Sequence, residues 1–299
     1  MSSRRPGNDA AMRIKGPIDT SSVEDRRGLR GGGLAIGGGG LGIVGVIVYL
    51  LVNVLGGGSS GFAVDQPGQG FPAMPGTSQT APALSCPQGA GTSDECFVAG
   101  VVGDVQRSWA AAFQRDGRTY ERTKLVLFSG STQSGCGAAD AATGPFYCPA
   151  DRKVYLDLSF FQELKDRFQA PGDFAQAYVV AHEIGHHVQT LLGIESQVRD
   201  LMQSHPDQQN DLSVRLELQA DCFAGVWAHS AYGELDPGDI DEALAAAAAV
   251  GDDRLQRQAT GTVDPDSFTH GTSAQRQTWF GKGYQGGDVN SCDTFSGGV

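Results

Sequence analysis

The sequence is poor in positive charge and lacks the marks of a nucleic-acid-binding protein. Its 299 residues include 22 Lys or Arg against 34 Asp or Glu, a formal net charge of −12. Binding to nucleic acid needs a basic face, and no basic stripe with interleaved aromatic residues occurs here. We therefore exclude nucleic acid as a partner. The hydrophobic content of 40% and the charged content of 19% also exclude a wholly disordered chain.

Cysteine is absent from the first 85 residues, and no C-x-x-C pair occurs anywhere in the chain. That missing pair argues against a cysteine-ligated metal site, the alternative use of six cysteines. We expect the six to form disulfides in an oxidising compartment. Many pairings are possible. Proximity in the sequence favours Cys86–Cys96 and Cys136–Cys148, and Cys222–Cys292 would then tie the C-terminal tail to a helix.

One long uncharged run lies near the N-terminus. Residues 34–55 carry no charge, and as a helix they would span about 33 Å, enough to cross a bilayer. Residues 1–33 carry seven Lys or Arg against four Asp or Glu, so the positive-inside rule places them in the cytoplasm. We therefore predict a single-pass protein of the cell membrane, with an extracytoplasmic catalytic domain. A cleaved signal peptide is the alternative, although the GGGSSG that follows offers no clear cleavage site.

Four segments follow from these patterns. Residues 1–33 are a basic cytoplasmic tail, and residues 34–55 are a transmembrane helix. Residues 56–85 are rich in Gly, Pro, Ser and Gln without apolar periodicity, which is typical of a flexible linker. Residues 86–299 form the ordered domain and are numerous enough for one hydrophobic core.

The ordered domain is predicted to be mainly helical with a small sheet, an α+β fold. Apolar residues at helical spacing predict the helices, and short apolar runs bounded by turn residues predict the strands. The predicted helices are 94–114, 159–168, 173–192, 211–232, 237–250 and 273–282. The predicted strands are 124–128, 146–148 and 153–157. Asp173 is the expected N-cap of its helix, and Gly193 is the expected stop.

The motif that carries chemistry is HEIGH at His182–His186, inside the predicted helix 173–192. Residues four apart leave a helix on one face, so both imidazoles can bind the same Zn²⁺ ion. Glu183 lies about 100° round the helix, where its carboxylate reaches a metal-held water without becoming a ligand. This H-E-x-x-H pattern is that of zinc metalloproteases. The alternative is a pair of surface histidines.

A catalytic zinc ion needs a third protein ligand and an open position. One class of these enzymes supplies a His six residues after the second, but Leu192 occupies that position. The other choice is Glu217, on the predicted helix 211–232. Asp221, one turn later, would accept a hydrogen bond from the non-ligating nitrogen of a ligand histidine. The alternative is an ordinary half-exposed acidic pair.

A further candidate is His270, which precedes the predicted helix 273–282. Peptide hydrolysis passes through an oxyanion that needs a donor besides the metal, and His270 fits that role, with Arg276 as a weaker candidate. The alternative is that His270 caps the helix or binds a carbonyl. The other histidines after the motif are expected to be structural or at the surface: His187, His205 and His229.

Two backbone features are also expected near the motif. A bound peptide would extend a sheet edge, and we expect the strand 153–157 to be that edge. Gly185 costs about 1 kcal/mol in helix propensity relative to Ala, which suggests a close approach by another segment at that point.

Longer stretches extend the motif. They are AHEIGHHVQ, LELQADCFAGVWAHS, IDEALAAAAAVGDDRLQ and SFTHGTSAQRQTWF, with MRIKGPIDTSSVEDRRG, GCGAAD and PFYCPADRKVYLDLSFF before them. Together they resemble the membrane-anchored bacterial family of neutral zinc metallopeptidases, over nearly the whole chain except the linker. The resemblance implies a zincin-like fold, a gluzincin ligand set of His182, His186 and Glu217, and Glu183 as catalytic base. It supplies no substrate.

These observations predict a membrane-tethered zinc peptidase that cleaves peptides or proteins, with Glu183 and His270 as its catalytic groups. Two alternatives stay open: a catalytically silent, zinc-stabilised binding or scaffold protein, and a zinc hydrolase that acts on something other than peptides. The presence of Glu183 favours the enzyme. So does the lack of an evident fourth ligand, because structural zinc sites are normally closed by four. No feature of the sequence indicates an oligomeric state.

Overall fold

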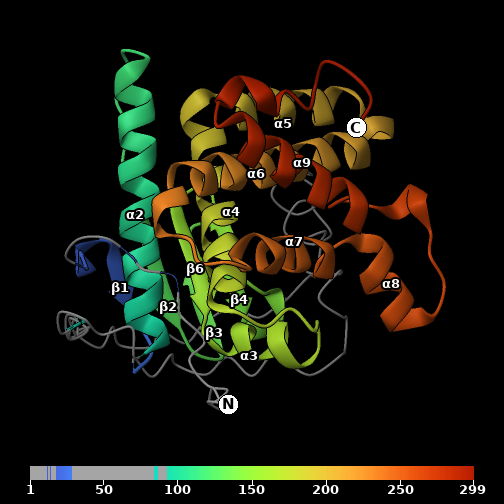
Figure 1. The fold of residues 1–299 in the computed structure, drawn as a ribbon. Coiled ribbons are helices and arrows are strands. Elements are labelled where there is room, and N and C mark those ends of the chain that lie inside the picture. Colours follow the sequence, from blue (N-terminus) through green and yellow to red (C-terminus); the bar gives the residue numbers. More distant parts are fainter. Residues whose placement is uncertain (1–11, 13, 15–17, 29–83, 87–92) are drawn as a thin grey trace, which may run out of the picture.

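The computed structural model describes residues 12, 14, 18–28, 84–86 and 93–299 (Figure 1). The predicted transmembrane helix 34–55 lies outside the described residues, as does nearly all of the predicted linker 56–85. In the part of the chain that is described, no helix combines the length and the apolar character needed to cross a membrane.

The described residues form the expected α+β fold, mainly helical with a small sheet. The helices are α2 (Asp94–Arg115), α3 (Ser159–Asp166), α4 (Asp173–Leu192), α5 (Ile194–Ser204), α6 (Gln209–Ser230), α7 (Asp239–Ala249), α8 (Asp252–Thr260) and α9 (Ser273–Gly286). The strands are β1 (Val23–Asp25), β2 (Lys124–Phe128), β3 (Ser131–Ser134), β4 (Gly137–Asp140), β5 (Phe146–Cys148) and β6 (Lys153–Asp157). Strands β2, β5 and β6 and helix α4 have the predicted bounds.

Helix α4 differs from the prediction at its first residue. Its N-cap is Gly172, with φ 124°, and Asp173 is the first helical residue. There its carboxylate still lies at the positive end of the helix dipole. The helix ends as predicted at Gly193, which adopts the left-handed conformation with φ 76°.

The main sheet has four strands in the order β1-β2-β6-β5. Strand β2 pairs in parallel with β1 and β6, while β5 pairs with β6 in antiparallel orientation. Strand β6 therefore lies inside the sheet, and the prediction that residues 153–157 form an open edge is wrong. Its residues Val154–Asp157 are all buried, as expected for an interior strand. The edge is β5.

Helix α4 lies at the centre of the molecule (Figure 1). It contacts α2, α6 and α7 and also reaches strands β5 and β6. Helix α9 packs along α6 so closely that side chains do not fit between the two backbones. A Cβ atom on Gly225 would lie 2.1 Å from the carbonyl oxygen of Phe280, and one on Gly283 would lie 1.9 Å from that of Cys222. These glycines fix α9 against the helix that carries Glu217.

All six cysteines form disulfides, with the predicted pairing of Cys86–Cys96, Cys136–Cys148 and Cys222–Cys292. The third bond joins α6 to the C-terminal segment, as expected. The second joins the β3–β4 hairpin to strand β5, at the edge of the main sheet.

The domain begins earlier than the predicted boundary at residue 86. Strand β1 belongs to the segment 18–28, which the sequence analysis assigns to a separate N-terminal tail. In the structure this strand pairs with β2, with Val23 opposite Leu125. Part of the predicted tail is therefore part of the same folded body.

Candidate metal centre

The two histidines of the HEIGH motif converge with Glu217 at one point between α4 and α6. The Nε2 atom of His182 lies 3.2 Å from one oxygen of Glu217, and the Nε2 atom of His186 lies 3.5 Å from the other. One ligand atom from each of the three residues lies within 4.8 Å of the others. Zinc bonds of about 2.0–2.2 Å in a tetrahedral site separate ligand atoms by about 3.3–3.5 Å. The two imidazoles and the carboxylate therefore fit a zinc ion.

Gly185 allows the two helices to bring these ligands together. A Cβ atom at this position would lie 3.0 Å from the carbonyl oxygen of Ala220 and 3.2 Å from its Cα atom. The expected close approach is thus present, and the approaching segment is α6. Ala220 stands between Glu217 and Asp221 in the sequence, so the contact places both carboxylates beside the histidines.

Asp221 holds the first histidine through its other nitrogen. Its Oδ1 atom lies 2.8 Å from Nδ1 of His182 and also accepts a hydrogen bond from the hydroxyl of Tyr178. Arg276 donates to both oxygens of the same carboxylate, at 2.8 Å and 2.9 Å. The geometry matches the predicted role of Asp221. Arg276 is 3% exposed and committed to Asp221, so the structure does not favour it as the oxyanion donor.

Gln189 supports the second histidine in a way that the sequence analysis did not foresee. Its Oε1 atom lies 2.9 Å from Nδ1 of His186, and its amide nitrogen donates to the carbonyl of Leu216 at 2.7 Å. The sequence feature that could have predicted this contact is the position of Gln189, about one helical turn after His186 on the same helix. Each histidine therefore turns Nδ1 to a buried partner and Nε2 to Glu217, which fixes both ring orientations.

Charges within the site shift the acidities of its groups in opposite directions. Burial lowers the pKa of His182, but the Asp221 carboxylate and the hydrogen bond to Glu217 outweigh it and raise that pKa to about 10. Burial raises the pKa of Glu217, but His186, His182 and His270 overcome it, so the net pKa lies well below the usual range. Burial raises the pKa of Glu183, and the neighbouring imidazoles only partly oppose this. Of the carboxyl groups of Glu183, Glu217 and Asp221, that of Glu183 is therefore the one whose pKa is raised towards neutral pH.

His270 faces the same centre from the loop before α9. Its Nδ1 atom lies 3.0 Å from Oδ1 of Asp252, and the other oxygen of Asp252 accepts the backbone N–H groups of residues 269, 270 and 271. The Nε2 atom of His270 is buried and has no hydrogen-bond partner in the described part of the chain. Burial lowers the pKa of His270, but Asp252 and Glu217 raise it, and the net shift is upward.

Two observations bear on the alternative that His270 caps α9. The cap of α9 is Thr272, whose hydroxyl accepts the N–H of Gln275, so His270 does not cap the helix. Its ring instead lies at the wall of a cleft that also contains Glu183. Sequence analysis missed Asp252, the residue that orients His270. It lies 18 residues upstream at the start of α8, a distance over which sequence pattern gives no signal.

The other histidines have the expected places. His187 is fully buried, with Nε2 2.7 Å from the carbonyl oxygen of Glu121 and Nδ1 3.1 Å from the hydroxyl of Tyr147. It thereby links α4 to strand β5. His205 and His229 are exposed.

A cleft of about 250 Å³ opens over the candidate metal centre. Glu183, His270 and the three candidate ligands line this cleft, together with Phe146 and Tyr147 of strand β5. The apolar side chains that line it include those of Phe160, Phe168, Val179, Met202, Leu216, Val250 and Leu255. An extended chain that entered the cleft would pass the free edge of β5.

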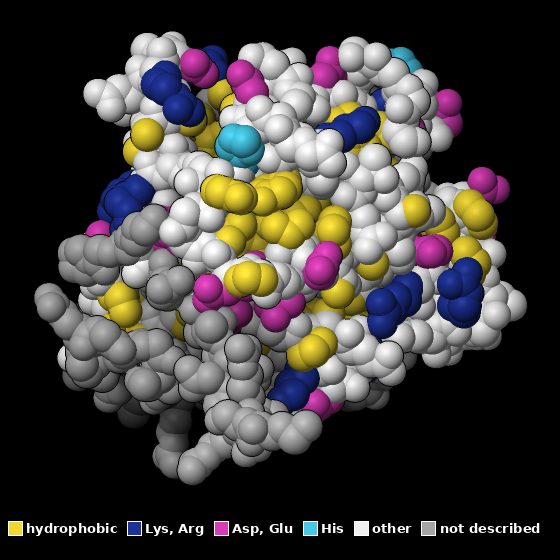
Figure 2. Space-filling view, in the orientation of Figure 1, with side chains coloured by type: hydrophobic (Ala, Val, Ile, Leu, Met, Phe, Trp, Pro, Cys, Tyr) yellow, Lys and Arg dark blue, Asp and Glu magenta, His cyan; other side chains and the backbone are white. Residues whose placement is uncertain are grey.

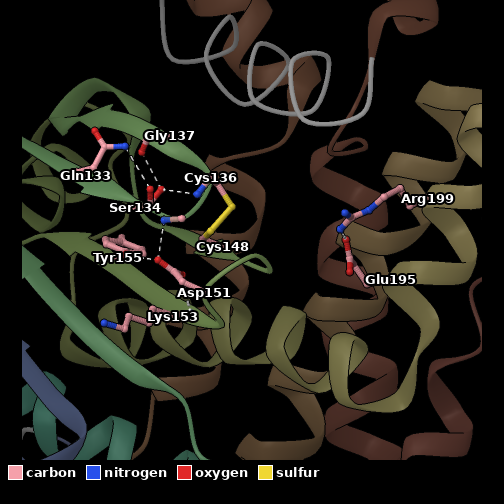
Figure 3. The surroundings of a disulfide bond; sticks show 11 residues. Gln133, Ser134, Cys136, Gly137, Cys148, Asp151, Lys153, Tyr155, Glu195 and Arg199 are labelled. Atoms are coloured by element: carbon pink, nitrogen blue, oxygen red, sulfur yellow. Dashed lines mark hydrogen bonds and ion pairs between the residues drawn. A yellow bond between two sulfur atoms is a disulfide. The ribbon is translucent and has the colours of Figure 1, made fainter. Parts of the chain in front are cut away.

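The two rims of the cleft are built differently (Figure 3). One rim holds the Cys136–Cys148 disulfide, next to which Asp151 accepts the N–H of Gly135 at 2.7 Å. The other rim is formed by α5, where Arg199 pairs with Glu195. The disulfide fixes the strand beside which a substrate would lie. On the face of the molecule shown in Figure 2, Lys and Arg side chains are scattered and form no continuous basic patch.

Comparison with known proteins places the chain in a family. Residues 12–295 match the family model described as "Putative neutral zinc metallopeptidase". The chain belongs to this family. The resemblance seen in the sequence is thus confirmed, and the family implies Zn²⁺ as the cofactor.

Relatives extend over most or all of the chain. The "Uncharacterized protein YpfJ" of Escherichia coli (strain K12) is 46% identical over 295 residues, which covers 95% of this chain and 99% of the relative. The "Uncharacterized protein Rv2575" of Mycobacterium tuberculosis (strain H37Rv) is 52% identical over 190 residues, or 59% of this chain and 64% of the relative. No solved structure matches the chain.

Proposed function

We propose that this protein is a zinc-dependent peptidase that hydrolyses peptide bonds in its cleft. The observation that carries the proposal is the convergence of His182, His186 and Glu217 beside Glu183. Among the described residues, this cluster contains three candidate ligands and no fourth. Three protein ligands and an open position are what a catalytic zinc site requires, whereas a structural site is normally closed by four.

The Glu183 side chain is suited to move a proton during hydrolysis. When bound, zinc supplies a Lewis acid that polarises the scissile carbonyl and lowers the pKa of a water molecule. Glu183 lines the cleft beside the ligands and accepts the proton of the attacking water. Because burial raises its pKa, the carboxyl group can hold this proton and then donate it to the leaving amine.

His270 is suited to stabilise the negative charge that develops on the carbonyl oxygen. Asp252 accepts from Nδ1, so Nε2 donates a hydrogen bond only when the ring carries both protons. The upward shift of the His270 pKa favours that doubly protonated form. A charged donor held in a buried site without rearrangement is an effective oxyanion partner.

The substrate is proposed to bind in an extended conformation along strand β5. In the described part of the chain this strand pairs on one side only, with β6, and its residues Phe146 and Tyr147 line the cleft. Main-chain hydrogen bonds to such an edge bind peptides without requiring one sequence. A sheet edge beside a helix that carries the zinc motif also supports the zincin-like assignment. The three disulfides support an extracytoplasmic location. The apolar run 34–55 is proposed to attach the protein to the membrane.

A digestion experiment tests the proposal. The full-length protein and its Glu183→Gln variant are loaded with zinc, brought to equal metal content, and incubated with a mixture of peptides. We expect mass spectrometry to show cleavage by the wild type and at least about 100-fold less by the variant, because general base catalysis contributes about 10²–10⁴-fold. Equal cleavage by both would contradict the role of Glu183. If neither cleaves while each holds one zinc ion, the zinc-stabilised binding protein is the better account.

A further inference from the structure

The N-terminal segment 18–28 supplies a strand to the peptidase sheet. Val23, Glu24 and Asp25 of β1 pair in parallel with Leu125, Val126 and Leu127 of β2. The backbone N–H of Arg26 continues the ladder with a 2.7 Å hydrogen bond to the carbonyl of Leu127. Without this segment, β2 would be an exposed edge with unpaired backbone groups.

Two apolar residues further upstream belong to the same core. Met12 is 4% exposed within the main hydrophobic cluster, and its backbone N–H donates to the carboxylate of Asp173 at the start of α4. Ile14 packs against α2 at Gly100, where a Cβ atom would lie 2.7 Å from the Ile14 side chain. The helix thus has a glycine at the point where the N-terminal segment lies against it.

Ion pairs attach the segment at several further points. Glu24 pairs with Lys153 of β6 at 2.8 Å, and Asp19 pairs with Arg122 at 3.0 Å. Arg27 approaches Glu95 of α2 at 3.7 Å. The contacts reach both the sheet and α2, so the segment is fitted to the domain along its length.

We propose that Met12, Ile14 and residues 18–28 lie on the same, extracytoplasmic side of the membrane as residues 93–299 and form one folded unit with them. A single crossing by residues 34–55 would put these two parts on opposite sides, where β1 and β2 cannot pair. The chain between them therefore crosses the bilayer an even number of times, zero included. This inference replaces the predicted cytoplasmic N-terminus. It concerns the topology of the chain and does not depend on the proposed activity.

The disulfides indicate which side the unit occupies. All three lie in residues 86–299, and such bonds persist in oxidising compartments. Because Met12, Ile14 and residues 18–28 pack on that disulfide-bonded part, they share its compartment.

The family comparison is consistent with a shared unit. The family model begins at residue 12, before the apolar run, and continues to residue 295. The Escherichia coli relative also aligns over 95% of this chain. The N-terminal segment is thus part of what the family has in common.

Cysteine labelling of the full chain in right-side-out membrane vesicles tests the topology. Ser21 and Ser204 are both exposed, and every native cysteine is in a disulfide, so each single variant Ser21→Cys and Ser204→Cys carries one reactive thiol. Ser204 on α5 reports the side of the catalytic domain. We expect a membrane-impermeant maleimide to label both variants to the same extent before lysis. Labelling of Ser204→Cys alone, with Ser21→Cys reached only after lysis, would overturn the proposal.

A second measurement tests the packing itself. A protease site inserted within residues 56–85 allows the chain to be cut between the N-terminal segment and the rest of the domain. After cleavage in mild detergent, we expect the two fragments to co-purify and to separate in denaturant. The matched variant Val23→Asp, which puts a charge on β1 without altering the cut, should release the N-terminal fragment. Separation of the wild-type fragments under native conditions would show that the segment is not an integral strand. Neither measurement requires catalysis. The labelling and co-purification results can therefore be interpreted even if the protein cleaves no peptide in the digestion experiment.

Discussion

Arg276 donates two hydrogen bonds to Asp221, from Nε at 2.8 Å and from Nη2 at 2.9 Å. Asp221 is fully buried and also binds Nδ1 of the candidate ligand His182. The arginine therefore holds the carboxylate that holds the histidine. A planar guanidinium fork makes both contacts at once, whereas a lysine offers a single point charge.

Removing this arginine should weaken zinc binding without touching a ligand. In Arg276→Met, Asp221 loses its cationic partner and His182 loses a fixed orientation. We expect zinc affinity to fall about 10–100-fold, as is typical for partners of ligand histidines. Competition with a chelating dye measures the zinc affinity. Arg276→Lys should retain part of the affinity, and wild-type affinity in Arg276→Met would show that Asp221 needs no arginine.

Replacing His270 should slow catalysis while leaving the metal in place. In His270→Gln, the buried nitrogen aimed into the cleft is changed, and we expect kcat to fall about 10²–10³-fold, as for loss of one oxyanion donor. Zinc content and KM should change little, because His270 is not among the candidate ligands. A large loss of zinc with the loss of rate would assign His270 to the metal instead.

The pH dependence of kcat tests the pair formed by His270 and Asp252. The pKa of His270 is raised, and the doubly protonated ring is the donor, so the contribution of His270 to kcat should be full below this pKa and be lost as pH rises through it. Asp252→Asn removes the carboxylate that raises the pKa. We therefore expect the alkaline limb of the kcat profile to move to lower pH in that variant. An unmoved limb would mean that another group controls it.

Zinc binding to the metal-free protein should release a proton at neutral pH. The pKa of His182 is raised to about 10, so this ring is protonated at pH 7, and a ligand histidine must be neutral. Affinity should rise by about tenfold for each pH unit until the pKa is reached. Titration calorimetry in two buffers of different ionisation enthalpy counts the protons. Asp221→Asn, which lacks the main charge that raises this pKa, should release fewer. No proton release by the wild type would contradict the charge arrangement.

The substitution Gly185→Ala has two opposing effects: it raises the helix propensity of α4, and it crowds the contact between α4 and α6. Alanine gains about 1 kcal/mol over glycine in a helix interior. However, its Cβ atom would lie 3.0 Å from the backbone oxygen of Ala220, and forcing such packing costs about 1–3 kcal/mol. We expect no gain in thermal stability and weaker zinc binding, because Glu217 shifts with α6.

Gly281 provides the matched control for that variant. It lies within α9, and a Cβ atom there would have no neighbour within 4 Å. Gly281→Ala should therefore raise the free energy of unfolding by about 1 kcal/mol and leave zinc affinity unchanged. Denaturant titrations measure the free energy of unfolding of both variants, and chelator competition measures their zinc affinity. Together they separate the effect of the α4–α6 contact from the effect of helix propensity. A similar stability gain in both variants would mean that the α4–α6 contact accommodates a Cβ atom at residue 185.

Local pattern in the sequence predicted the elements whose burial is periodic. Helix α4 has the predicted bounds because its apolar face and Gly193 both act locally, and the HEIGH spacing depends only on helix geometry. Its partner Glu217 was also expected, and the structure brings it to the two histidines. What failed were decisions that depend on distant parts of the chain. The composition of strand β6 is compatible with an edge strand and with an interior strand. It lies inside the sheet because β2 and β5 pair with it on its two sides.

The missed elements have specific physical reasons. Strand β1 has three residues, two of them charged, and it is stabilised by pairing with β2 about 100 residues later. Helix α8 is largely polar, and its burial of Asp252 depends on the loop at residues 269–271. The hairpin of β3 and β4 contains mostly small and polar residues without alternation. In each case tertiary contacts, which the local sequence does not encode, determine the structure.

Anomalous diffraction at the zinc edge, from crystals of the zinc-loaded full-length protein, would locate the metal ion. We expect one strong peak at about 2.0–2.2 Å from Nε2 of His182, Nε2 of His186 and the carboxylate of Glu217. Glu183 should lie outside bonding distance, and no fourth protein atom should bind. A peak closed by four protein ligands, or one located away from these three residues, would contradict a catalytic zinc site in this cleft.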